Sequence, residues 1–190
     1  MESGFVMKTY EKFRNGMFLA PSRTYGETYM EPILRKYLGL SKSDTGENDA
    51  VNDNSEYEEI KCSKVLSTKP KKDSLVERII LENENNVLDR LVPFSECYNS
   101  KYDANIQNVK RDHFKKLVYI MLFEDCIKIF ESDVDDIAEI PNWSGRHGRY
   151  DEFGKSGQFA IKKNNIKWHL ENNLIDTLTW DEVYDIATGL

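Results

Sequence analysis

Two carboxylates and one amine lie close together in the stretch from residue 46 to residue 64. Glu59 and Lys61 are separated by one residue, and Asp49 precedes them across an Asn- and Asp-rich segment at residues 52–55. That segment favours a tight turn, because Asn and Asp tolerate positive φ and hydrogen-bond their own backbone. Alternate side chains of a strand share a face, so Glu59 and Lys61 should project together. A hairpin closed at this turn would bring Asp49, on its first strand, opposite both.

This combination of side chains suits phosphodiester hydrolysis. Asp49 and Glu59 offer hard oxygen ligands for a Mg²⁺ ion that keeps most of its waters. Such an ion lowers the pKa of a bound water and neutralises charge that develops on the phosphate in the transition state. Lys61 can orient the attacking water or bond the scissile phosphate. The sequence therefore favours a metal-dependent nuclease site.

Two alternatives exist for these residues. Glu-x-Lys occurs by chance in many charged proteins, where it forms an ordinary solvated pair on an exposed strand. The upstream aspartate, the turn and the apolar run that follows favour the catalytic interpretation. Asp53 is a rival for the upstream carboxylate, but it lies in the predicted turn, so we prefer Asp49.

The pattern Asp49…Glu59-Ile60-Lys61 resembles the core of the PD-(D/E)XK nucleases, and Glu-Ile-Lys-Cys-Ser at residues 59–63 is similar to small type II restriction endonucleases. The resemblance implies that Asp49 and Glu59 are metal ligands and that Lys61 is the catalytic lysine. Asn48 stands where the family often has a proline. The resemblance covers most of the chain, but its specific part is confined to residues 49–63.

An acidic residue on the helix before the core is a further feature of such nucleases. Glu27 is the candidate, near the start of a helical pattern that extends to Gly39. Pro32 complicates this assignment, because proline is tolerated in a first turn but kinks a helix interior. If the helix begins near Glu31, Glu27 lies in a loop and is a solvated or capping carboxylate.

Basic and polar residues in two loops and one strand are candidate DNA contacts. The glycine-punctuated segment 143–157 suits both base and phosphate recognition, since Arg matches the O6 and N7 acceptors of guanine. The basic loop 67–73 suits phosphate contact. Either segment would otherwise be an ordinary charged surface loop. The candidate contacts are Lys64, Lys71, Lys110, Arg146, His147, Arg149, Lys155 and Ser156, with Gln107 as an accessory residue of the predicted strand 104–110.

Composition restricts the class of protein. A chain of 190 residues that is 39% hydrophobic can build one core, so we expect a single domain over residues 1–190. No run approaches the roughly 20 apolar residues that cross a bilayer. Three scattered cysteines favour a reduced, intracellular (cytoplasmic) protein. The net charge of −7 argues against a protein that coats nucleic acid through bulk electrostatics. Acidic residues concentrate in 82–96 and 133–139 and basic residues in 61–72 and 146–167, and this segregation could give one positive cleft on an acidic body.

Hydrophobic periodicity places the remaining elements. Helices are predicted over 5–18 and, after a Thr179/Glu182 capping box, over 180–187. The apolar run 117–123 and the alternating 126–130 predict a buried hairpin, and 158–162 predicts another strand. With the resemblance, this implies an α/β fold with a mixed central β-sheet of about five strands flanked by helices.

The function that the resemblance implies is a Mg²⁺-dependent type II restriction endonuclease acting on double-stranded DNA. One active site cuts one strand, so a homodimer would read a palindromic sequence and cut both strands. A repair or recombination nuclease of the same fold, which reads DNA structure, is one alternative. A non-catalytic regulatory module whose acidic surface binds a protein is another.

Overall fold

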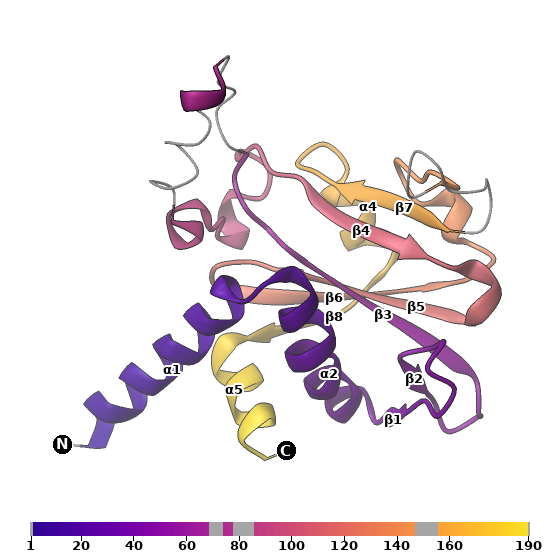
Figure 1. Cartoon of the computed structure of the whole chain (residues 1–190), viewed down its shortest axis with the longest axis horizontal. Helices are drawn as coiled ribbons and strands as arrows, with labels where there is room; N and C mark the ends of the chain where they lie inside the picture. The colour runs from indigo at the N-terminus through magenta and orange to yellow at the C-terminus, as the bar shows by residue number, and fades with distance from the viewer. Residues whose placement is uncertain (1, 69–73, 78–85, 147–155, 190) are drawn as a thin grey trace.

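The central feature of the structure, a computed structural model that describes residues 2–68, 74–77, 86–146 and 156–189, is a mixed β-sheet (Figure 1). Within the described residues its strands follow the order β1-β2-β3-β5-β6-β8. The parallel pair is β3 with β5, and the other neighbours are antiparallel. The bounds are β1 (Ser41–Lys42), β2 (Ala50–Val51), β3 (Tyr57–Lys64), β5 (Lys116–Leu122), β6 (Cys126–Asp133) and β8 (Leu174–Thr179). The predicted α/β fold is confirmed, with six strands in place of about five.

Helices cover one face of this sheet (Figure 1). They are α1 (Glu2–Leu19), the π-helix η1 (Thr24–Met30), α2 (Glu31–Leu38) and α5 (Trp180–Thr188). Apolar side chains from the strands, among them Ile60 and Ile120, pack there against Phe18, Leu34 and Trp180. Gly39 ends α2 with a left-handed φ of 70°, and the predicted capping box at Thr179 starts α5.

A two-stranded antiparallel ribbon covers the opposite face, together with α4 (Ile166–Asn172) (Figure 1). The ribbon consists of β4 (Ala104–Val109) and β7 (Gly157–Ile161). Its inner side chains, including Ile106 and Phe159, pack on Tyr119 and Phe130 of the sheet. Both strands were predicted, but their separation from the central sheet was not.

Short 3₁₀ turns join these layers: η2 (Val87–Arg90), η3 (Phe94–Glu96), η4 (Arg111–His113) and η5 (Ile137–Glu139). In the described part of the chain, no helix is long and apolar enough to span a membrane. Strand β3 lies between the helices and the ribbon. Its side chains point alternately towards one and the other, because successive residues of a strand alternate faces.

Candidate active site

The β2–β3 hairpin brings the predicted catalytic residues together. Its register pairs Ala50 with Glu58, so Asp49, which directly precedes β2, lies beside Glu59. Asn52 forms the predicted turn: its Oδ1 accepts the backbone N–H groups of Asn54 and Glu56, both at 3.0 Å. The hairpin is therefore as expected, except that Asp49 stands just before the first strand and not within it.

Asp49, Glu59 and Lys61 form what we call the Lys61 cluster. Asp49 Oδ2 accepts the backbone N–H of Ile60 at 2.8 Å and lies 3.4 Å from Lys61 Nζ. The same ammonium forms an ion pair with the Glu59 carboxylate. Two carboxylates thus share one ammonium group, which is the convergence that the sequence predicted.

The cluster lies at the protein surface. The Asp49 and Lys61 side chains are 23% and 22% exposed, and Glu59 is 8% exposed. Parts of the Lys61 and Asp49 side chains are therefore in contact with solvent, while the Glu59 side chain is almost wholly buried. Low dielectric around Glu59 strengthens its interactions with charges nearby.

Burial and charge act in opposite directions on these groups. Burial raises the pKa of Glu59, the Lys61 ammonium partly counteracts this, and Asp49 adds to the rise. Burial opposes the charge on Lys61, but Glu59 and Asp49 together raise its pKa above the ordinary value. Lys61 is therefore a cation at neutral pH. Chemically, Lys61 can therefore act as a hydrogen-bond donor and a positive charge, not as a base.

A further carboxylate, Glu31, lies beside the cluster and was missed as a site residue. Burial and the negative charge of Asp49 raise the pKa of Glu31 to about 7, against the opposing effects of Lys61 and Arg35. Arg35 Nη1 lies 3.7 Å from Glu31 Oε2 and donates to the backbone carbonyl of Asp49 at 3.4 Å. Arg35 therefore ties α2 to the strand that carries the cluster.

The sequence had instead suggested Glu27 as the helix carboxylate. The Glu27 side chain is 57% exposed and pairs with Arg23 at 2.9 Å. It lies in the π-helix η1, where the N–H of Glu31 bonds the carbonyl of Gly26, five residues back. Pro32 in the first turn of α2 was the available signal, because it indicated that the α-helix proper starts at Glu31.

The candidate DNA contacts occupy different surroundings. Lys110 is exposed and near enough to Glu59 to lower its pKa, and Gln107 is exposed on β4. Lys64 Nζ donates to the carbonyls of Phe18 and Ala20 at the end of α1, at 2.8 and 2.6 Å. Lys110 is thus close enough to act on the cluster electrostatically, whereas Lys64 joins β3 to the end of α1.

The remaining candidates lie in or beside the 143–157 segment and the basic loop. Arg146 is exposed, whereas Ser156 is buried. Four of the predicted contacts lie outside the described residues, namely Lys71, His147, Arg149 and Lys155. Their DNA contacts, like those of the other candidates, stay predictions.

The donor set fits a magnesium ion. Within the described residues no group of three or more His, Cys, Asp or Glu side chains is close enough to hold a metal. Asp49 and Glu59 nevertheless offer two hard oxygen ligands, and Mg²⁺ binds through one or two carboxylates and otherwise keeps water. Burial leaves Glu59 and Glu31 with raised pKa values, so a cation here would offset negative charge that Lys61 and Arg35 only partly balance.

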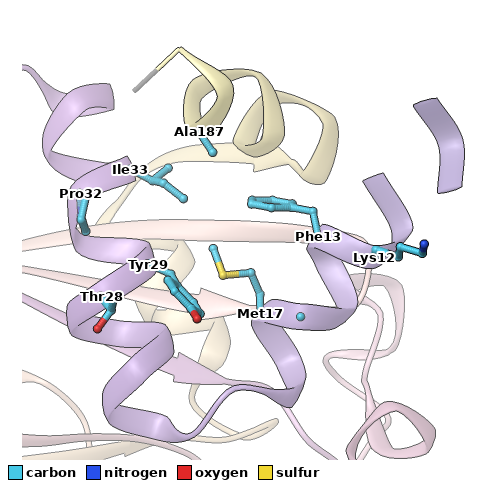
Figure 2. A pocket seen from close by; sticks show the side chains of 9 residues that line it. Lys12, Phe13, Met17, Thr28, Tyr29, Pro32, Ile33 and Ala187 are labelled. Carbon is cyan, nitrogen blue, oxygen red and sulfur yellow. The ribbon is translucent and has the colours of Figure 1, made fainter. Parts of the chain in front are cut away.

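A separate cavity of about 440 Å³ lies on the helical face, among α1, η1, α2 and α5 (Figure 2). Mainly apolar side chains, such as Phe13, Met17 and Ile33, point into it, with Lys12 at its edge. It contains no residue of the Lys61 cluster. Its lining offers no carboxylate pair for phosphodiester hydrolysis, so the candidate active site is the Lys61 cluster.

Comparison with protein-family models and with curated proteins found no match for this chain.

Proposed function

We propose that this chain is a Mg²⁺-dependent endonuclease of the type II restriction class that hydrolyses double-stranded DNA. The observation that carries the proposal is the convergence of Asp49, Glu59 and Lys61 at the surface end of the β2–β3 hairpin. Two carboxylates beside a charged amine are the minimal set for hydrolysis of a phosphodiester with a divalent ion.

Each residue has a distinct role in the proposed reaction. Asp49 and Glu59 would hold the magnesium ion, which supplies an acidified water and positive charge near the phosphate. Lys61, kept charged by its two carboxylate neighbours, donates to a non-bridging phosphate oxygen and stabilises the charge that develops there. The Ile60 N–H fixes one oxygen of Asp49, so the carboxylate is already oriented before substrate binds.

Glu31 and Arg35 support this site from α2. The Glu31 carboxyl, with a pKa of about 7, can accept or release a proton at neutral pH next to Asp49. Arg35 holds Glu31 and the Asp49 backbone at the same time, which keeps the helix in register with the hairpin.

The proposed partners follow from the reaction. One Lys61 cluster per chain hydrolyses one strand, so a homodimer would cut both strands of a palindromic site. The proposed substrate, cellular or invading DNA, implies an intracellular protein.

Incubation of the purified full chain with unmodified phage DNA tests the proposal. We expect discrete fragments with Mg²⁺ and intact DNA when EDTA is present. Cleavage restricted to mismatched or branched duplexes would replace restriction by repair. Absence of hydrolysis on linear, supercoiled, mismatched and branched DNA, with a cooperative unfolding transition intact, would refute the nuclease proposal and favour a regulatory binding module.

A further inference from the structure

The outer face of the β4–β7 ribbon carries amide side chains. Asn105, Gln107 and Asn108 of β4 are exposed, and Gln158 of β7 is half-buried. The inner face of the same ribbon is apolar and packs on the sheet. An amphipathic ribbon is expected to have a polar outer face. Here that face presents neutral groups that are both donors and acceptors.

A β-bulge directs two of these amides outward in succession. The register of β4 and β7 shifts between Ile106 and Val109, and Asn108 has a φ of 58°. Gln107 and Asn108 are therefore both exposed, where regular alternation would bury one of them. In the described part of the structure, neither side chain makes a hydrogen bond, and the same holds for Gln158. These amides are available for an external partner.

Lysines lie at both ends of the ribbon. Lys101 and Lys163 are exposed at the end where Ala104 pairs with Ile161, and Lys110 is exposed at the other end, beside Glu59. Asp103, next to the first end, is within 3.6 Å of Lys162, so its charge is matched. The ribbon thus presents a neutral amide face between positive ends, on a chain whose net charge is −7.

This arrangement matches the major groove of duplex DNA in shape and in chemistry. A two-stranded ribbon fits the groove, which is roughly 12 Å wide. Six residues of strand extend about 20 Å, so lysines at the two ends can reach phosphates on both sides of the groove. Asn and Gln pair in a bidentate manner with N6 and N7 of adenine.

We propose that the β4–β7 ribbon enters the major groove and reads adenine-containing base pairs through Gln107 and Asn108, while Lys101, Lys110 and Lys163 contact the flanking phosphates. The inference rests on the proposed function, because it takes duplex DNA as the substrate. It makes the ribbon, and not only the 143–157 segment, a determinant of sequence specificity. Lys110 is three residues from Gln107, so the bases read lie within a few base pairs of the cut phosphate.

Selection from a randomised duplex DNA pool tests the inference. The full-length Lys61→Ala chain is used with Mg²⁺ and a short incubation, so that binding is measured while cleavage is slow. We expect an enriched motif that contains adenine. Gln107→Ala in this background should reduce the preference at one base pair about 10-fold or more, because a bidentate base contact is lost. Asn108→Gly, which keeps the positive φ, should relax an adjacent position.

Asn172→Ala is the matched control, because Asn172 is an exposed amide on α4 beside the acidic residues Glu131 and Asp136. It should leave the motif unchanged. The ribbon inference would be overturned if both the Gln107→Ala and the Asn108→Gly chains select the same motif as the Lys61→Ala chain that keeps these amides. The ribbon inference would also be overturned if the unsubstituted chain cleaves phage DNA but the selection yields no enriched motif. In both cases the nuclease proposal survives. If the chain neither binds nor cleaves DNA, both the ribbon inference and the nuclease proposal are overturned.

Discussion

Two clusters of two carboxylates and one lysine lie on neighbouring strands of the same sheet, and they differ in how their charges are balanced. The first is the Lys61 cluster of Asp49, Glu59 and Lys61. The second, which we call the Lys116 cluster, contains Glu58, Lys116 and Glu131. Glu58 directly precedes Glu59 in β3, so the two glutamates point to opposite faces. Each cluster has two carboxylates and one lysine, so the two are nearly identical in residue type.

Their surroundings separate them. In the Lys116 cluster, Lys116 Nζ lies 2.5 Å from Glu131, with both side chains about one third exposed, and Glu58 accepts the Asn52 amide at 3.1 Å. Each carboxylate there has its own donor. In the Lys61 cluster two carboxylates share one ammonium, and Glu31 adds a further negative charge nearby. Surplus acid does not distinguish the clusters, because Asp133 lies near Lys116 and Glu56 near Glu58. What distinguishes the candidate metal site is that the Asp49 and Glu59 carboxylates converge on one ammonium group.

The largest difference between the clusters is expected from a comparison of the two lysine variants. Lys61→Ala should reduce DNA cleavage by about 10²–10³-fold, since a charge aimed at the transition state is lost, and leave DNA binding nearly intact. Lys116→Ala should change cleavage less than about threefold and stability by about 0–1 kcal/mol, because its ion pair is solvated. Cleavage rates on phage DNA and thermal unfolding measure both. Full Mg²⁺-dependent cutting by Lys61→Ala would show that Lys61 is not catalytic.

A smaller loss of cleavage is expected from substitution of Glu31. Glu31→Gln should lower the cleavage rate about 10–100-fold, as loss of a residue that supports metal ligands does. Glu27→Gln, one helical turn earlier and exposed, should have a much weaker effect. Equal losses from the two variants would restore Glu27 as the helix carboxylate that the sequence suggested.

The same variant has a pH signature. Folding raises the pKa of Glu31 from 4.5 to about 7, so the folded chain binds more protons in this window and its stability falls as the pH rises from 4.5 to 7. Glu31→Gln should remove this fall and raise the free energy of unfolding by about 1–2 kcal/mol at pH 8. Urea unfolding at several pH values measures it. An unchanged pH slope would contradict the account of Glu31.

The smallest effect is expected from metal-dependent stability. At ten times its Kd, Mg²⁺ should stabilise the folded chain by about 1.4 kcal/mol and raise Tm by about 3–5 °C. Glu59→Gln should abolish this shift because a ligand is lost, whereas Glu58→Gln should retain it. An equal Mg²⁺ response from the two adjacent variants would remove the distinction between the clusters.

The fold could be predicted where short-range patterns decide it. The turn at Asn52, the hairpin of β5 and β6 and the Thr179 cap each depend on local chemistry, and all were found. Strand β8 and helix α4 were missed. In β8 the side chains from Leu174 to Thr179 have no regular alternation of burial, because the strand lies at the sheet edge.

The candidate site was predicted in its hairpin part and missed in its helix part. Asp49 and Glu59 are linked by strand register, which sequence spacing reveals. Glu31 depends on the rotation of α2, and the π-helix before it changes the angle between successive side chains. No α-helical periodicity could place Glu27 and Glu31 correctly across that segment.

Trp143 and Gly157 mark the two ends of the glycine-punctuated segment, and their packing ties the stem of that segment to the ribbon. A Cβ atom at residue 157 would lie 2.0 Å from the Trp143 ring, and Ser144 and Gln158 exchange backbone hydrogen bonds at 2.8 and 2.9 Å. The stem is thus fixed by a contact that tolerates only hydrogen at residue 157. Any side chain at residue 157 would push aside the Trp143 ring, whose centroid lies 6.4 Å from that of Phe159, so one added methyl group would disturb the packing of the ribbon on the sheet as well as the stem.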